Sequence, residues 1–212
     1  TGAVKKLPPK EIFEENILEL KLGDDVDVED IKKKLSFMGY ERISTVENRG
    51  EFSVRGGIID VFTPDADYPY RIELFDTEID SIRTFDADTQ RSKEVLKYVS
   101  ISQCSQIVKD RELFDRAEAN IRRAYEKSIK KIEKKEGNSE RVHNLRQREQ
   151  QLIEYSESMI NLQYMEKFIN YFYDETMYIW DYMKDPLVLI DDPARILAVS
   201  YTHLTLPTNR EV

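Results

Sequence analysis

Residues 50–91 read GEFSVRGGIIDVFTPDADYPYRIELFDTEIDSIRTFDADTQR, and this stretch decides the fold. Apolar and polar residues alternate in four runs, over 51–55, 58–62, 70–75 and 78–85, which is the period-two pattern of half-buried strands. Gly56-Gly57 separates the first two runs by only two residues, and glycine tolerates the positive φ angles of a tight hairpin turn. A second turn lies at TPDADYP. The stretch therefore predicts a meander of short, mainly antiparallel strands.

The residues just before this meander predict a further strand and one helix. ILELKL, at residues 17–22, alternates apolar and charged residues like a strand. Asp27 is a suitable N-cap for a helix that ends at Gly39, with apolar residues at helical spacing inside it. Another strand-like run covers residues 42–46. Together these elements predict a compact α+β domain built on a mainly antiparallel sheet.

The second half of the chain has the pattern of long helices. Apolar residues recur every three or four positions between Phe114 and Ile132, which predicts an amphipathic helix. Gly137-Asn138-Ser139 ends it, and a second apolar stripe runs from Val142 to Met159. A third begins near Leu162. Two adjacent helices with a short break predict a helical hairpin.

Composition excludes several classes of protein. The chain has 212 residues, a net charge of −9 and one cysteine, Cys104, so it forms no intrachain disulfide and we expect a reducing, cytoplasmic setting. No apolar run approaches the roughly 20 residues of a membrane-spanning helix, so we expect no membrane association. The acidic balance also argues against coating of nucleic acid by the whole chain.

The end of the chain is of a different kind. Residues 199–208 read VSYTHLTLPT, which looks like one translated frame of a sequencing adaptor. We therefore interpret residues 199–212 as adaptor sequence and leave them out of the fold prediction. A genuine polar tail is the alternative.

A catalytic site is hard to find in this sequence. No glycine is followed by Lys-Ser or Lys-Thr, so the phosphate-binding loop of nucleotide hydrolases is absent. The two histidines, His143 and His203, form neither a zinc-ligand spacing nor a nucleophile–base arrangement with Cys104. LVLI, at residues 187–190, predicts a buried strand that ends in Asp191-Asp192, a place where nucleotide hydrolases hold Mg²⁺. Without a phosphate loop we interpret these two acids as a degenerate motif.

The predicted hairpin is locally basic. Ten basic and five acidic residues lie between Arg122 and Glu149. Such a segment could contact phosphates, or it could be a solvated helix pair with interleaved opposite charges. Tyr125 is the one aromatic residue there, so base stacking has little support. We favour the solvated helix pair.

The predicted sheet has a polar face with both charges. In the run 51–55, Ser53 and Arg55 alternate with apolar residues, and in the run 70–75 Arg71 and Glu73 do the same. Arg55, Arg71 and Glu73 can therefore share one face, with opposite charges available for pairing across strands. The residues alone leave open whether this face binds a partner or is an ordinary polar surface.

Residues 50–91 are similar, nearly word for word, to the bacterial transcription-repair coupling factors and, more distantly, to the UvrB subunit of the excinuclease. GYERI before this run and LVLIDDPARI after the helices fit the same family. The resemblance covers nearly all of residues 7–196. It implies an N-terminal fragment in which a docking domain interrupts a degenerate, RecA-like ATPase lobe.

On this basis the chain divides into five parts. The resemblance implies the end of the ATPase-like lobe at residues 1–22, the UvrB-type interaction domain at 23–102, a helical insert at 103–182, and a returning strand of the lobe at 183–198; the adaptor occupies 199–212.

The resemblance also implies a binding site. Arg42, Arg55, Arg71 and Glu73 align with the residues with which UvrB grips the excinuclease subunit UvrA. Ser53 replaces an arginine of UvrB, a departure that affects the strength of the expected contact and not its location.

The implied function is that of a non-catalytic docking module. It recruits the excinuclease subunit UvrA to lesions where RNA polymerase has stalled, in transcription-coupled nucleotide excision repair. No cofactor is expected in this chain, since ATP and Mg²⁺ belong to a separate DNA-translocating motor of the full protein, whose other parts contact RNA polymerase and DNA. The alternatives are a helicase-like ATPase fragment and a nucleic-acid-binding module that uses the basic helical hairpin.

Overall fold

The computed structural model describes residues 5–137, 139–189 and 191–195. The chain divides into two compact units, one of residues 11–109 and one of residues 1–10 with 110–212. The first unit is built on a mainly antiparallel sheet and the second is helical, so the predicted α+β fold class is confirmed. Within the described residues, no helix is both long enough and apolar enough to span a bilayer.

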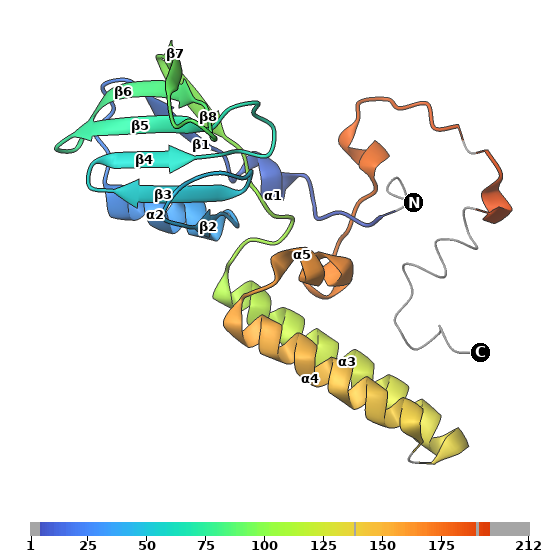
Figure 1. Cartoon of the computed structure of the whole chain (residues 1–212). Coiled ribbons are helices and arrows are strands. Elements are labelled where there is room, and N and C mark those ends of the chain that lie inside the picture. The colour runs from blue at the N-terminus through green and yellow to red at the C-terminus, as the bar shows by residue number, and fades with distance from the viewer. Residues whose placement is uncertain (1–4, 138, 190, 196–212) are drawn as a thin grey trace. The chain divides into compact units, whose positions relative to one another are not determined.

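The first unit is organised around a six-stranded sheet with the order β2-β3-β4-β5-β6-β7 (Figure 1). Its strands are β2 (Glu41–Arg42), β3 (Glu51–Arg55), β4 (Ile58–Val61), β5 (Tyr70–Phe75), β6 (Glu78–Phe85) and β7 (Ser92–Leu96). Each strand from β3 onward pairs antiparallel with the next one along the chain. The short β2 pairs parallel with β3 and forms one edge.

Helix α2 (Val28–Phe37) forms where its N-cap predicts. The Asp27 carboxylate accepts hydrogen bonds from the backbone N–H groups of Glu29 and Asp30, at 2.6 and 3.2 Å. After the helix the chain turns at Gly39, where φ is +93°. A Cβ there would lie 2.5 Å from the Cβ of Ser105, so both the turn and the close approach require glycine.

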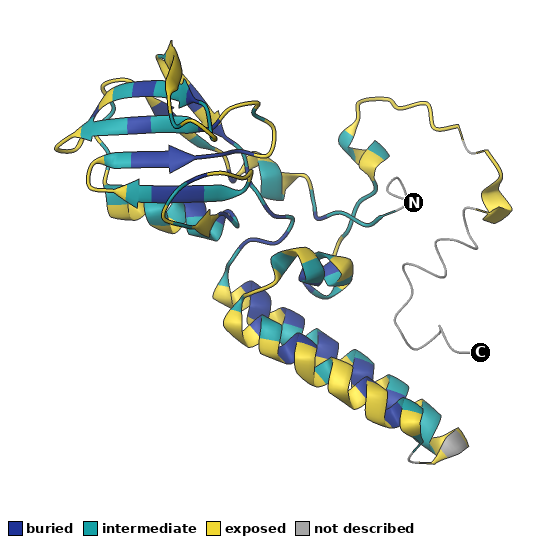
Figure 2. Cartoon of the chain, viewed as in Figure 1, coloured by how far each residue is buried: buried dark blue, intermediate teal, exposed yellow. Residues whose placement is uncertain are grey.

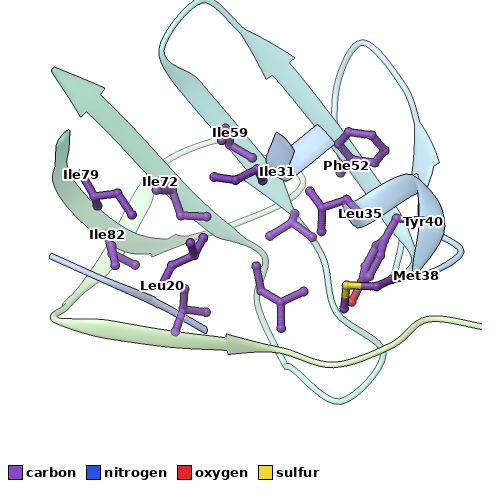
Figure 3. Close-up of a cluster of buried hydrophobic side chains, with 13 residues drawn as sticks. Leu20, Ile31, Leu35, Met38, Tyr40, Phe52, Ile59, Ile72, Ile79 and Ile82 are labelled. Atoms are coloured by element: carbon purple, nitrogen blue, oxygen red, sulfur yellow. The ribbon is translucent and has the colours of Figure 1, made fainter. Parts of the chain in front are cut away.

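One face of the sheet carries the core of this unit (Figure 3). Ile31 and Leu35 of α2 pack on it, and so do residues of a separate two-stranded ribbon, in which β1 (Leu18–Lys21) pairs antiparallel with β8 (Tyr98–Ile101). The buried cluster comprises Leu20, Ile31, Leu35, Met38, Tyr40, Phe52, Ile59, Val61, Ile72, Ile79, Ile82, Val99 and Ile101. A second, smaller buried cluster comprises Val46, Phe62 and Phe85.

The predicted strands are confirmed with three differences. The run over 42–46 forms a strand only at β2, and β7 and β8 were not predicted. β7 is exposed along almost its whole length and has no alternation of apolar and polar residues, so its sequence carries no period-two signal. The short helix α1 (Glu11–Glu14) was not predicted either.

The second unit contains the predicted helical hairpin. Its helices are α3 (Arg111–Glu136) and α4 (Glu140–Ser158), which run side by side (Figure 1). The side chains of Phe114, Ile121, Val142 and Leu145 are buried along the hairpin, and the exposed residues of both helices form its outer surface (Figure 2). The predicted third helix is divided into α5 (Leu162–Met165) and the 3₁₀ helix η2 (Glu166–Tyr171). A further 3₁₀ helix, η3, covers Ile179–Tyr182.

The expectation of a buried strand at residues 187–190 needs correction. Residues 187–189 form no strand, and Leu187 and Leu189 are 87% and 85% exposed. An apolar run stays in a sheet only where neighbouring strands pair with its backbone, and no strand of the described residues does so. Ile190 lies outside the described residues, and so does the adaptor-like sequence at residues 199–212.

Candidate docking face

The turn between β3 and β4 fixes which residues share the outer face of the sheet. Only Gly56 and Gly57 separate these strands, so Arg55 pairs with Ile58 and Ser53 with Asp60. The pairing continues across β5 and β6 in two rows. The first row is Ser53, Asp60, Arg71 and Arg83, and the second is Arg55, Ile58, Glu73 and Ser81. We call these two rows the charged face.

Asp60 lies at the centre of the charged face and is fully buried. The guanidinium of Arg71 donates to both of its carboxylate oxygens, from Nε to Oδ1 at 2.6 Å and from Nη2 to Oδ2 at 2.8 Å. Arg55 donates from Nη2 to Oδ2 at 2.8 Å. A buried carboxylate needs such partners, because an unpaired charge in a low-dielectric site is strongly destabilising. Asp60 therefore holds two arginines in fixed positions.

Arg71 makes further contacts within the unit. Its Nη2 donates to Oε1 of Gln90 at 3.2 Å, and its guanidinium lies over the ring of Phe85, 4.4 Å from the centroid. Hydrogen bonding to Asp60 raises the pKa of Arg71 above its ordinary value. Only 15% of the Arg71 side chain is exposed, against 49% for Arg55. Arg55 is thus the more accessible of the two arginines.

Glu73 is paired on the same face. It forms a salt bridge with Arg83 and accepts a hydrogen bond from the Ser81 hydroxyl at 3.0 Å. Arg71 and Arg83 stand directly opposite each other in the sheet, a like-charge pair that Asp60 and Glu73 offset from the neighbouring positions. The charged face is therefore a network in which each charge has an opposite charge beside it.

Two large apolar side chains border the charged face. Phe75, two residues after Glu73 on β5, is 80% exposed. Val95 on β7 pairs in register with Arg83 and is 81% exposed. Large exposed apolar groups beside fixed charges are typical of the surfaces that proteins use to bind one another.

The structure brings three of the four predicted site residues together. Arg55, Arg71 and Glu73 all lie on the charged face. Arg42 does not lie on this face. It is an exposed residue of the edge strand β2, and it pairs in register with the core residue Phe52 of β3. Ser53 lies on the charged face but is buried, and its hydroxyl has no hydrogen-bond partner among the described residues.

Three contributors to this face were missed in the sequence. They are Asp60, Arg83 and Gln90. Asp60 could have been found, since a two-residue turn at Gly56-Gly57 already places it opposite Ser53. Gln90 carries no such signal, because it reaches Arg71 from a loop position with φ of 59°.

The other candidate residues form no second site. Asp191 is exposed, and Asp192 accepts a hydrogen bond from the backbone N–H of Arg195 at 3.1 Å, as a residue that caps a turn does. In the part of the chain that the structure describes, no group of three or more His, Cys, Asp or Glu side chains is arranged to hold a metal ion.

Residues 18–106 match the family described as the UvrB interaction domain. This range contains the six-stranded sheet, α2 and the ribbon of β1 and β8. The first unit is thus an interaction domain of the UvrB type.

Curated relatives extend the similarity to the second unit. The chain is 37% identical over 196 residues to the transcription-repair-coupling factor of Staphylococcus aureus (strain MRSA252), which covers 92% of the chain and 16% of that protein. It is 35% identical over 205 residues to the factor of Staphylococcus haemolyticus (strain JCSC1435), with 96% and 17% covered. The chain belongs to the transcription-repair-coupling factor family, and it spans about one sixth of the length of these relatives.

Proposed function

We propose that the charged face docks the excinuclease subunit UvrA, and that the chain is a non-catalytic module which recruits this protein. The observation that carries the proposal is the buried Asp60, which holds Arg55 and Arg71 on the outer surface of an interaction domain. Arginines held in advance lose little conformational freedom on binding, so more of the contact energy appears as affinity. A carboxylate of the partner suits the planar fork of such an arginine.

The two arginines have different parts in this proposal. Arg71 already donates three hydrogen bonds within the unit and is mostly buried, so its part is to stabilise the charged face. Arg55 shares Asp60 with Arg71 and is half exposed, which leaves donors for a partner. Phe75 and Val95 supply the apolar area that a protein interface needs around its charges. Arg42 would contact only the margin of this surface.

The wider setting follows from the family. We propose that docking occurs in the cytoplasm, at lesions where RNA polymerase has stalled, in transcription-coupled nucleotide excision repair. The parts of the full-length relatives that this chain does not span would contact RNA polymerase and DNA, and would bind ATP and Mg²⁺ to translocate DNA. No cofactor takes part in the docking step itself.

Isothermal titration of the chain with purified UvrA tests the proposal. Truncating an interfacial arginine buried on binding costs about 2 kcal/mol or more, so Arg55→Ala should weaken binding at least tenfold. Phe75→Ala should have an effect of similar size. Arg71→Ala should also weaken binding, and the charged face must then be checked for folding by hydrogen exchange.

Lys130→Ala provides the control, because Lys130 is an exposed residue of α3 in the second unit. It should leave binding to UvrA unchanged. The docking face is wrongly placed if Lys130→Ala weakens binding while Arg55→Ala and Phe75→Ala do not.

A further inference from the structure

The charges on α3 are separated onto two sides of the helix. Residues three, four or seven positions apart lie on the same side of a helix. The acids Asp115, Glu118, Glu126 and Glu133 line one side, and each pairs with an arginine or a lysine. Arg116, Arg123, Lys127 and Lys134, spaced by seven, four and seven residues, line another side and are all exposed. We call these four residues the basic row.

The basic row differs from the acidic side of α3 in its ion pairing. In the described part of the chain, none of its four side chains forms an ion pair, whereas Arg111, Arg122, Lys130 and Arg146 all do. Lys131 lies beside the row and adds to its charge, while Glu112, one turn before Arg116, is the acid nearest to its start. This arrangement differs from the interleaved charges expected of a solvated helix pair.

We infer that the basic row is a binding surface for the phosphate backbone of nucleic acid. It extends from Arg116 to Lys134 of α3, a separation of about 27 Å at the helical rise of 1.5 Å per residue. Each strand of a duplex carries one phosphate per 3.4 Å of helix axis, so charges distributed over this length can reach several phosphates. The row offers charge at regular intervals and nothing that reads bases.

The surroundings of the basic row favour nucleic acid over an acidic protein. A stable protein interface has a desolvated apolar centre with aromatic or aliphatic anchors. Among the described residues of α3 and α4, no large hydrophobic side chain is exposed. Phosphate contacts need no such anchor, because release of condensed counterions drives the binding. The net charge of −9 on the whole chain does not prevent it, since charges more than about 10 Å apart are largely screened at 0.1 M salt.

Fluorescence anisotropy of a labelled 20-base-pair duplex of mixed sequence, titrated with the full chain, tests the inference. Binding should be detectable at 50 mM salt and should weaken as salt rises. Four phosphate contacts predict a slope of about −3 to −4 in a plot of log K against log salt. The variant Arg123→Gln/Lys127→Gln/Lys134→Gln keeps good helix formers at all three positions. It should weaken binding at least tenfold at 50 mM salt and reduce the slope to about −1.

A matched variant removes the same charge from the same hairpin. Arg111→Gln/Arg122→Gln/Arg146→Gln takes away three paired cations on the acidic side and should retain most of the affinity. The inference is overturned if the wild-type chain does not bind the duplex at 50 mM salt, or if both triple variants lose affinity equally. It is also overturned if polyglutamate displaces the chain as well as unlabelled duplex does at equal charge, since the row would then be an acidic-protein site.

Discussion

The Arg71 guanidinium is bound to the buried carboxylate of Asp60 through two parallel hydrogen bonds, of 2.6 and 2.8 Å. Arg55 contributes only one hydrogen bond to the same carboxylate, from a side chain that is half exposed. The two arginines that the sequence places on one face are therefore unequal. Arg71 stabilises the sheet, whereas Arg55 is available at the surface to bind a partner.

This inequality predicts different effects on stability. Arg71→Ala leaves the Asp60 charge with a single partner and should destabilise the first unit by about 3 kcal/mol, as breaking a buried ion pair does. Arg55→Ala should cost less than about 1 kcal/mol, because an exposed partner contributes little. Hydrogen exchange of the β4 and β5 amides measures the first unit alone. Equal losses of protection in the two variants would contradict the assignment.

Tyr125 predicts a stabilising substitution in the second unit. Its side chain is 1% exposed, and its hydroxyl has no hydrogen-bond partner among the described residues. Removing an unsatisfied buried hydroxyl relieves a desolvation penalty of about 1–3 kcal/mol, so Tyr125→Phe should raise the melting temperature at pH 7. Tyr155→Phe is the control, because the Tyr155 hydroxyl accepts a hydrogen bond from Gln151. Thermal unfolding followed by circular dichroism at 222 nm compares the two variants.

The same residue predicts a loss of stability at alkaline pH. Burial raises the pKa of Tyr125 from 10.0 to about 12. A raised pKa in the folded state means that the neutral phenol favours folding fully below pH 10, and that this contribution is lost as the pH rises towards 12. The melting temperature of the wild-type chain should fall more than that of Tyr125→Phe between pH 9 and pH 11. Parallel curves for both proteins would show that Tyr125 does not titrate in this way.

The turn between β3 and β4 predicts contrasting effects for its two glycines. A Cβ on Gly57 would lie 2.8 Å from the backbone oxygen of Leu74, so Gly57→Ala must move β4 away from β5 and should cost about 1–3 kcal/mol. Gly56 has φ of +62° and no atom within 4 Å of an added Cβ. Asparagine tolerates this backbone conformation, so Gly56→Asn should be nearly neutral. Thermal unfolding of the two variants distinguishes them, and a neutral Gly57→Ala would contradict the close approach.

The chain should hydrolyse no ATP above background. The reason is chemical, since no glycine-rich loop with a following Lys-Ser or Lys-Thr is present to hold the phosphates. A coupled phosphate-release assay at saturating Mg²⁺ and ATP measures this. Turnover that disappears in Asp191→Ala would show that the acids at residues 191–192 are functional rather than degenerate.

Local periodicity predicts much of this fold and fails at identifiable places. β3 to β6, α2 and the hairpin follow from alternation, spacing and capping, because each buries one regular stripe of side chains. β7 is exposed along almost its whole length and has no pattern of its own, whereas β2 covers only the start of the strand-like run at residues 42–46. The apolar run at residues 187–189 has a strong strand pattern and yet forms no strand, because no described strand pairs with it.

The candidate site, too, could be predicted only in part from the sequence. The two-residue turn and strand alternation place Arg55, Arg71 and Glu73 on one face, as predicted. The remaining contacts of the site depend on side chains that meet only in the folded protein. Sequence alone does not show that Asp60 is buried beneath two arginines, or that Gln90 reaches Arg71 from a loop. Arg42, expected near this face, lies on β2, which is parallel to β3 and pairs Arg42 with the core residue Phe52; its part in binding stays a prediction.

The ribbon of β1 and β8 has a practical consequence for protein engineering. Because Leu18 pairs with Ile101, the chain enters and leaves the sheet domain at neighbouring points. A segment whose two ends adjoin can be placed in a surface loop of another protein without forcing that loop apart. The stretch from β1 to β8 can therefore be inserted into an unrelated protein as one domain, and the insertion would carry the charged face with it.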